Sequence, residues 1–225
     1  MIYTDIILSS LCFLSYLSLL TSAALNSEHK LFLNGEACKK ITELNKLHLS
    51  GIIIFLVPIF FLDTDSLLLL HLKKDLILVK SIVLLLLGVS AGFVASHQVI
   101  KAKLTFVSTT ERNSRKSLET YLIIRVVFIV VYELFFRGIL LAVCLHYTSL
   151  VTALGINALF YTMAHAYAEK KEIIACPFFA TVLCLLTLWY NTFIPAAFIH
   201  VVLCFTYDNG ILKMLQNKPK QIVYE

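Results

Sequence analysis

The chain has 225 residues, of which 59% are hydrophobic and only 15% are charged, and its mean hydropathy is +0.85. This composition leaves too little polar surface for a water-soluble globule, so it predicts an all-α protein built as one polytopic membrane domain, residues 1–225. The net charge of +5 resides in segments between apolar runs, without a basic patch interleaved with aromatic residues. These basic residues are therefore expected to set the orientation of the spans and to contact anionic membrane lipid, and no nucleic-acid partner is expected.

Apolar runs, taken in chain order, predict a bundle of about seven transmembrane helices. A span needs about 20 mainly apolar residues. Runs of this kind cover residues 6–25, 48–63, 77–99, 120–146, 149–168, 173–189 and 192–207. The second run is short and ends near Asp63. The first run follows only Asp5, without a basic segment or a small-residue cleavage site, so we expect a retained span and not a signal peptide.

The basic residues between these runs predict the orientation. Most of them fall on one side: Lys30, Lys39, Lys40, Lys46, Lys101, Lys103, Arg112, Arg115, Lys116, Lys170, Lys171, Lys213, Lys218 and Lys220. The other side has Lys73, Lys74 and Lys80. The positive-inside rule therefore predicts a cytoplasmic C-terminus.

The six cysteines do not form a metal or disulfide pattern. They are Cys12, Cys38, Cys144, Cys176, Cys184 and Cys204. None is paired in a Cys-x-x-Cys spacing, and five lie within apolar runs, so they are expected to be small apolar residues. The chain also lacks a P-loop, a Gly-rich fingerprint and an internal repeat, so no nucleotide cofactor is expected.

Two charged residues interrupt the otherwise apolar stretch from Val126 to Cys144 in the fourth run. Glu133 and Arg137 are four residues apart, so they share one face of a helix and can form an ion pair. Charged groups at bilayer depth are costly and usually functional. This face is therefore predicted to point into the bundle.

Two histidines are predicted to join this pair. His165 lies in the fifth run and His200 in the seventh, whereas the other histidines, including His48, stand in loops, at helix ends or near the membrane boundaries. Those others are expected to be incidental. Arg125, two turns before Glu133, is either a second partner of Glu133 or points toward the membrane interface, and the interface is the favoured expectation.

A carboxylate and an imidazole can activate water, and a second imidazole with a neighbouring donor can stabilise an oxyanion. This set suits hydrolysis without a covalent intermediate. Two histidines and a glutamate are also a possible zinc ligand set, although the chain has no HExxH motif. A third reading is a proton-coupled carrier with these residues as a relay, but the chain lacks the repeats of many carriers.

Three motifs resemble those of the CPBP intramembrane proteases. The segment 132–138, Tyr-Glu-Leu-Phe-Phe-Arg-Gly, resembles Glu-Glu-x-x-x-Arg, Tyr161-x-x-x-His165 resembles Phe-x-x-x-His, and His200 resembles the His of His-x-x-x-Asn. They occur in family order over about residues 118–210, and are most similar to the type II CAAX prenyl proteases. The chain departs from the family at two positions, with Tyr132 for the first Glu and Cys204 for the Asn.

The resemblance implies a multi-pass endoplasmic-reticulum enzyme that removes the last three residues of prenylated CAAX proteins such as small GTPases. It implies that Glu133 and His165 activate water, that His200 with Cys204 stabilises the oxyanion, and that Arg137 orients Glu133. Because a phenol is a poor base at neutral pH, Glu133 would replace the first Glu. The alternative is an inactive homologue that binds prenylated or membrane proteins.

Overall fold

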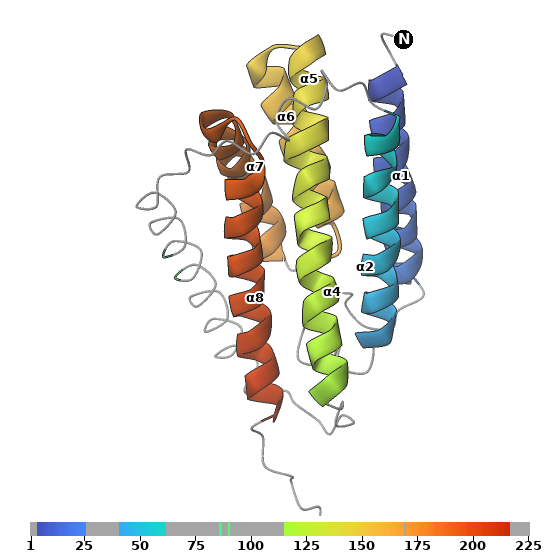
Figure 1. The fold of residues 1–225 in the computed structure, drawn as a ribbon, viewed down its shortest axis with the longest axis vertical. Helices are drawn as coiled ribbons and strands as arrows, with labels where there is room; N and C mark the ends of the chain where they lie inside the picture. The colour runs from blue at the N-terminus through green and yellow to red at the C-terminus, as the bar shows by residue number, and fades with distance from the viewer. Residues whose placement is uncertain are drawn as a thin grey trace, which may run out of the picture.

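The computed structural model describes residues 4–25, 41–61, 86, 90, 115–168 and 170–216, and these form helices and short turns without a strand. The helices run roughly side by side (Figure 1). Their bounds are α1 Thr4–Leu25, α2 Ile41–Leu56, the short 3-10 helix η2 Val57–Phe60, α4 Arg115–Glu133, the π-helix η4 Leu134–Leu140, α5 Leu141–Tyr147, α6 Leu150–Ala164, α7 Lys170–Tyr190 and α8 Ile194–Gln216. The all-α prediction is confirmed.

Four helices are long and apolar enough to cross a membrane, namely Thr4–Leu25, Thr42–Phe60, Glu119–Tyr147 and Lys170–Tyr190. Leu150–Ala164 is apolar but shorter. The predicted span 77–99 lies outside the described residues except for positions 86 and 90. The chain is therefore a multi-pass membrane protein, while the count of seven spans remains a prediction.

Two observed helices differ from the predicted spans at their ends, one by starting earlier and one by ending earlier. The second helix begins at Ile41 and not at 48, because its polar first turns are helical as well. The fifth ends at Ala164, since His165 caps it and the chain turns there. Hydropathy finds the apolar part of a helix and not its ends.

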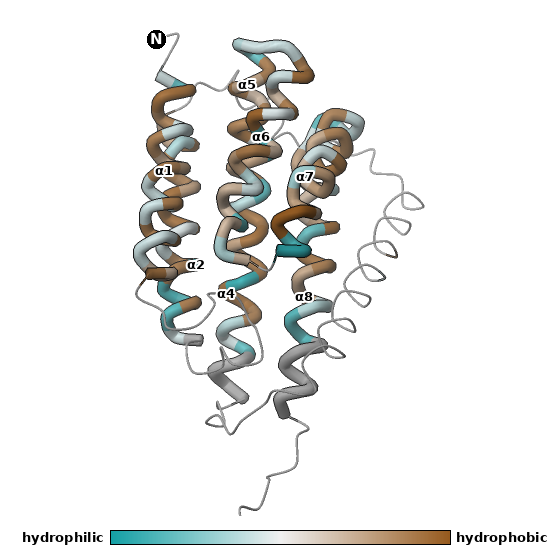
Figure 2. Tube along the Cα trace, turned by 180° about the vertical axis from the view of Figure 1, so that it is seen from behind, coloured by the Kyte–Doolittle hydropathy of each residue, from teal (hydrophilic) through white to brown (hydrophobic). Residues whose placement is uncertain are grey.

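The helices consist mostly of hydrophobic residues, which are brown in Figure 2, and many of their large apolar side chains are exposed. Phe60, Val151 and Trp189 are 81%, 80% and 76% exposed. A soluble protein rarely exposes so many large apolar groups, whereas a lipid solvent favours them. The buried centre is aromatic, and the rings of Phe55 and Tyr132 each pack against those of Phe128 and Phe136.

The central rod of the fold is α4, which continues through η4 into α5. It lies between α2 on one side and α8 on the other (Figure 1). The close approach of α2 depends on Gly51, because a Cβ there would lie 2.6 Å from the Phe128 ring and 2.9 Å from the Tyr16 ring. Helices that meet through a small residue pack closely in membranes.

Replacing Gly51 should therefore loosen this contact. We expect Gly51→Ala to lower the free energy of unfolding by about 1–3 kcal/mol, since the added methyl group overlaps two rings. Gly155→Ala is the matched control, because its Cβ would meet nothing within 4 Å, and it should be neutral or stabilising by about 0.5–1 kcal/mol. Thermal unfolding in detergent compares the two, and equal effects would contradict the role of Gly51.

Candidate functional site

The centre of the site is a buried ion pair at the junction of α4 and η4. Glu133 ends α4, and Arg137 lies in the π-helix that follows. Arg137 Nη1 donates to Glu133 Oε1 at 3.3 Å, and its Nε lies 3.1 Å from Oε2. Both side chains are fully buried, so each charge depends on the other for compensation. The predicted pairing is confirmed.

A buried amide holds the π-helix in place. Asn157 of α6 donates its Nδ2–H to the backbone carbonyl of Phe136 at 2.6 Å, and the thiol of Cys184 in α7 donates to Asn157 Oδ1 at 3.2 Å. Leu141 N–H also donates to Phe136 O across the wide turn. Asn157 thereby joins α6 and α7 to the segment that carries Arg137. π-Helical turns are rare and frequent at functional sites.

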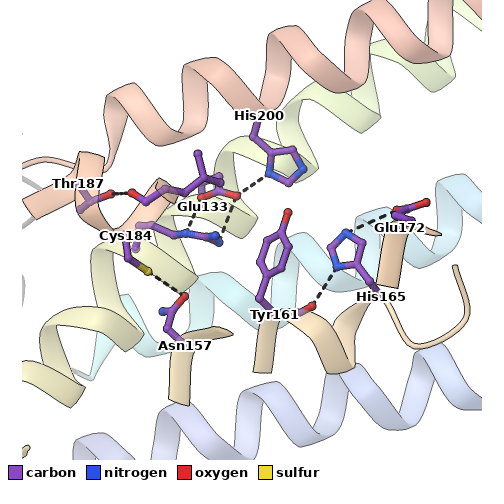
Figure 3. Close-up of polar contacts among 10 residues, drawn as sticks. Glu133, Asn157, Tyr161, His165, Glu172, Cys184, Thr187 and His200 are labelled. Atoms are coloured by element: carbon purple, nitrogen blue, oxygen red, sulfur yellow. Dashed lines mark hydrogen bonds and ion pairs between the residues drawn. The ribbon is translucent and has the colours of Figure 1, made fainter. Parts of the chain in front are cut away.

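His200 completes the group on the face of α8. Its Nδ1 lies in hydrogen-bonding contact with Glu133 Oε1 (Figure 3). Cys204 follows one helical turn later and is buried. One carboxylate thus receives a guanidinium from its own rod and an imidazole from α8. Of the predicted site residues, Glu133, Arg137, His200 and Cys204 lie together.

His165 occupies the end of α6, beside the start of α7. Its Nδ1 lies 3.0 Å from the carbonyl of Tyr161, and its Nε2 lies 4.0 Å from Oε1 of Glu172 (Figure 3). The imidazole stacks on the Tyr161 ring with 4.6 Å between centroids. Glu172 is a carboxylate that the sequence reading did not single out, because it stands among charged residues at a helix start.

Two tyrosines lie between the histidines. The Tyr161 centroid is 6.1 Å from that of His200, and the guanidinium of Arg137 lies 4.5 Å from the Tyr161 ring. The ring of Tyr132 is 6.3 Å from His165 and 6.0 Å from His200. The Tyr132 hydroxyl is buried without a hydrogen-bond partner among the described residues. The motif residues therefore surround an aromatic centre that contains one unsatisfied hydroxyl.

A second buried polar cluster corrects two predictions. His48 lies inside α2 and is buried, and Arg125 is turned into the bundle, where its Nη1 lies 3.0 Å from His48 Nε2. Arg125 Nε also lies 3.6 Å from Oδ2 of Asp208 in α8. His48 is thus not a loop residue, and Arg125 does not point to the interface. Asp208 was missed because it follows the predicted end of the last span.

The cysteines agree with the sequence reading. Cys12, Cys144, Cys176, Cys184 and Cys204 are buried free thiols, and Cys38 lies outside the described residues. Within the described ranges, no group of three or more His, Cys, Asp or Glu side chains is arranged to hold a metal ion.

The fold and these contacts define a multi-pass helical membrane protein with an ionisable site buried inside its bundle. Residues 115–206 match the family model of the type II CAAX prenyl endopeptidase Rce1-like proteins. This segment carries Glu133, His165 and His200, and the match supports the resemblance of this part of the chain to the CAAX protease family. The comparisons with curated proteins and with solved structures gave no match.

The buried ion pair should behave as a unit. We expect Glu133→Gln and Arg137→Met each to lower stability by about 3–5 kcal/mol, because each leaves an uncompensated buried charge. The double variant should lose clearly less than the sum of the two. Denaturant unfolding in detergent of all four proteins measures this coupling, and additive losses would contradict it.

Proposed function

We propose that the chain is an intramembrane endopeptidase that releases the C-terminal tripeptide of prenylated CAAX proteins by direct attack of water. The observation that carries the proposal is the pairing of each motif histidine with a carboxylate, His200 with Glu133 and His165 with Glu172, on either side of two tyrosine rings. The site lies within the segment that matches the protease family. The proposed setting is the endoplasmic-reticulum membrane with the C-terminus in the cytoplasm, where prenylated small GTPases are the substrates.

In this mechanism His165 and Glu172 activate the water. The 4.0 Å between His165 Nε2 and Glu172 Oε1 is longer than a hydrogen bond, and one water can bond to both atoms. The carbonyl of Tyr161 accepts from Nδ1–H, which places the basic lone pair of the neutral ring on Nε2. The water oxygen then bonds to the scissile carbonyl carbon. The proton passes through His165 to the leaving amine as the C–N bond breaks.

The opposite side would stabilise the oxyanion. Glu133 holds Nδ1 of His200, so the protonated ring presents Nε2–H as a fixed donor. Glu133 itself is occupied by Arg137 and His200, which favours an orienting role for this carboxylate and not direct attack on water. The unpartnered hydroxyl of Tyr132 is a further donor, while Cys204 is a weaker one. Glu172 then supplies the carboxylate that position 132 lacks.

The first test is release of the C-terminal tripeptide from a farnesylated CAAX peptide by the purified full chain in liposomes. We expect cleavage of the prenylated peptide, little cleavage of the unprenylated one, and loss of about 100-fold or more in His165→Ala, because general-base catalysis contributes 10²–10⁴-fold. A chelator arm distinguishes this mechanism from the zinc alternative, for which activity would be lost and then restored by added zinc. Full activity of His165→Ala would refute the proposed role.

Glu172 gives a sharper prediction because it is not part of the three motifs. We expect Glu172→Gln to lower kcat by about tenfold or more with little change in KM, since the amide keeps the size of the side chain but cannot accept a proton. Tyr167→Phe is the matched control, because it removes the hydroxyl that donates to Thr21. A Glu172→Gln variant as active as this control would return the role of base to Glu133.

The second candidate function is a binding homologue without proteolysis, which the substitution of Tyr for the first motif Glu favours. Such a protein would bind farnesylated peptide but release no tripeptide. Tyr132→Glu would discriminate the two functions, because a gain of cleavage where the parent shows none identifies position 132 as the missing base. The proton-coupled carrier predicts instead pH-dependent uptake of solute into vesicles.

A further inference from the structure

A second polar cluster lies two helical turns from the Glu133 site, in the same pair of helices. Arg125 of α4 contacts His48 of α2 at 3.0 Å and Asp208 of α8 at 3.6 Å, and the Tyr121 hydroxyl donates to Asp208 Oδ2 at 3.4 Å. Tyr121, His48 and Asp208 are only 2%, 4% and 2% exposed, whereas the Arg125 side chain keeps 18%. The cation is therefore the accessible member of the cluster.

The cluster has more hydrogen-bond donors than acceptors. His48 Nε2 accepts from Arg125, so the proton of a neutral ring is on Nδ1, and this buried atom has no partner among the described residues. Arg125 Nε likewise makes only the long contact to Asp208. A buried donor without an acceptor is costly, so the cluster is suited to a ligand that brings oxygen acceptors. An arginine fork matches a carboxylate in particular.

The spacing along the helices fits the length of the proposed leaving group. Arg125 and Glu133 are eight residues apart on α4, which is about 12 Å along the axis at 1.5 Å per residue. Asp208 and His200 have the same separation on α8. Three extended residues span about 10–11 Å. A tripeptide cleaved beside His200 and lying along α4 would thus end at Arg125.

We propose that Arg125, held by Asp208 and His48, binds the free C-terminal carboxylate of the CAAX tripeptide. This inference rests on the proposed function. Asp208 lies nearest to Nε and His48 to Nη1, so the fork retains donors for the ligand. Arg125 is thereby a specificity-determining residue. It lies three residues from the scissile bond and binds only a chain that ends there in a free carboxylate.

Binding of a fluorescent farnesylated CAAX peptide to the full-length His165→Ala variant in nanodiscs tests the proposal without cleavage. Peptides with a C-terminal carboxylate, a C-terminal amide, or one additional residue are compared. We expect the carboxylate peptide to bind about tenfold or more tightly than the other two. The amide peptide lacks the charge that pairs with Arg125, and the longer peptide carries this charge one residue too far from the scissile bond. Adding Arg125→Gln should abolish this preference while leaving amide binding unchanged.

Asp208→Asn provides a second variant of nearly the same shape. Removing its charge frees Arg125 for the ligand, so the preference for carboxylate over amide should be maintained or increased. Equal binding of the carboxylate and amide peptides by the His165→Ala protein would overturn the inference. An equal loss of binding of both peptides in Arg125→Gln would also overturn it, because Arg125 would then have a purely structural role. Tripeptide release with no carboxylate preference would refute this inference alone. A carboxylate preference without any cleavage would refute the proteolytic function and keep the binding site.

Discussion

The structure depends on compensating charges that have been removed from water. Glu133 and Arg137 are fully buried in the most apolar rod of the bundle, where an isolated charge is very costly. The carboxylate is compensated by a guanidinium from its own rod and by His200 from α8. Because these groups come from two elements, the electrostatic requirement also fixes how α8 sits against α4. A neutral contact joins the π-helix to two further helices, since Asn157 of α6 donates to the Phe136 carbonyl and accepts in turn from the Cys184 thiol of α7.

The two polar layers fix the register of α8 along α4. One layer contains Glu133 and His200, the other Arg125 and Asp208, and aromatic rings fill the space around both. In each layer a carboxylate and a cation approach from opposite helices, so neither layer carries a large net charge into the bundle. Such layers resist sliding of one helix along the other, because a shift of one turn would separate Glu133 from His200 and Arg125 from Asp208. A substrate aligned along α4 would therefore meet fixed groups at a fixed separation.

The sequence predicted those parts of the site that depend on local geometry. The Glu133–Arg137 pair follows from their i, i+4 spacing, and the place of His200 from its position in an apolar run. The π-helix could not be predicted, because it depends on an amide from a distant helix. His48 was wrongly placed at a helix end because hydropathy missed the polar start of α2, and Arg125 was wrongly directed to the interface because its partners were not known from the sequence. Their true positions depend on each other and on Asp208, which is tertiary information.

The residue at position 132 illustrates how burial restricts the charges that a polar site inside a membrane bundle can hold. A second carboxylate next to Glu133 would bring another negative charge to a position that is 3% exposed, where Arg137 already serves one carboxylate. Tyr132 fills this position with a neutral ring and a single hydroxyl. The carboxylate nearest to His165 is instead Glu172, whose side chain is 45% exposed and can remain ionised at little desolvation cost. In the proposed mechanism, a carboxylate at the start of α7 would serve as the acid–base partner of His165 without a further buried charge, and the α6–α7 turn would then take part in the reaction.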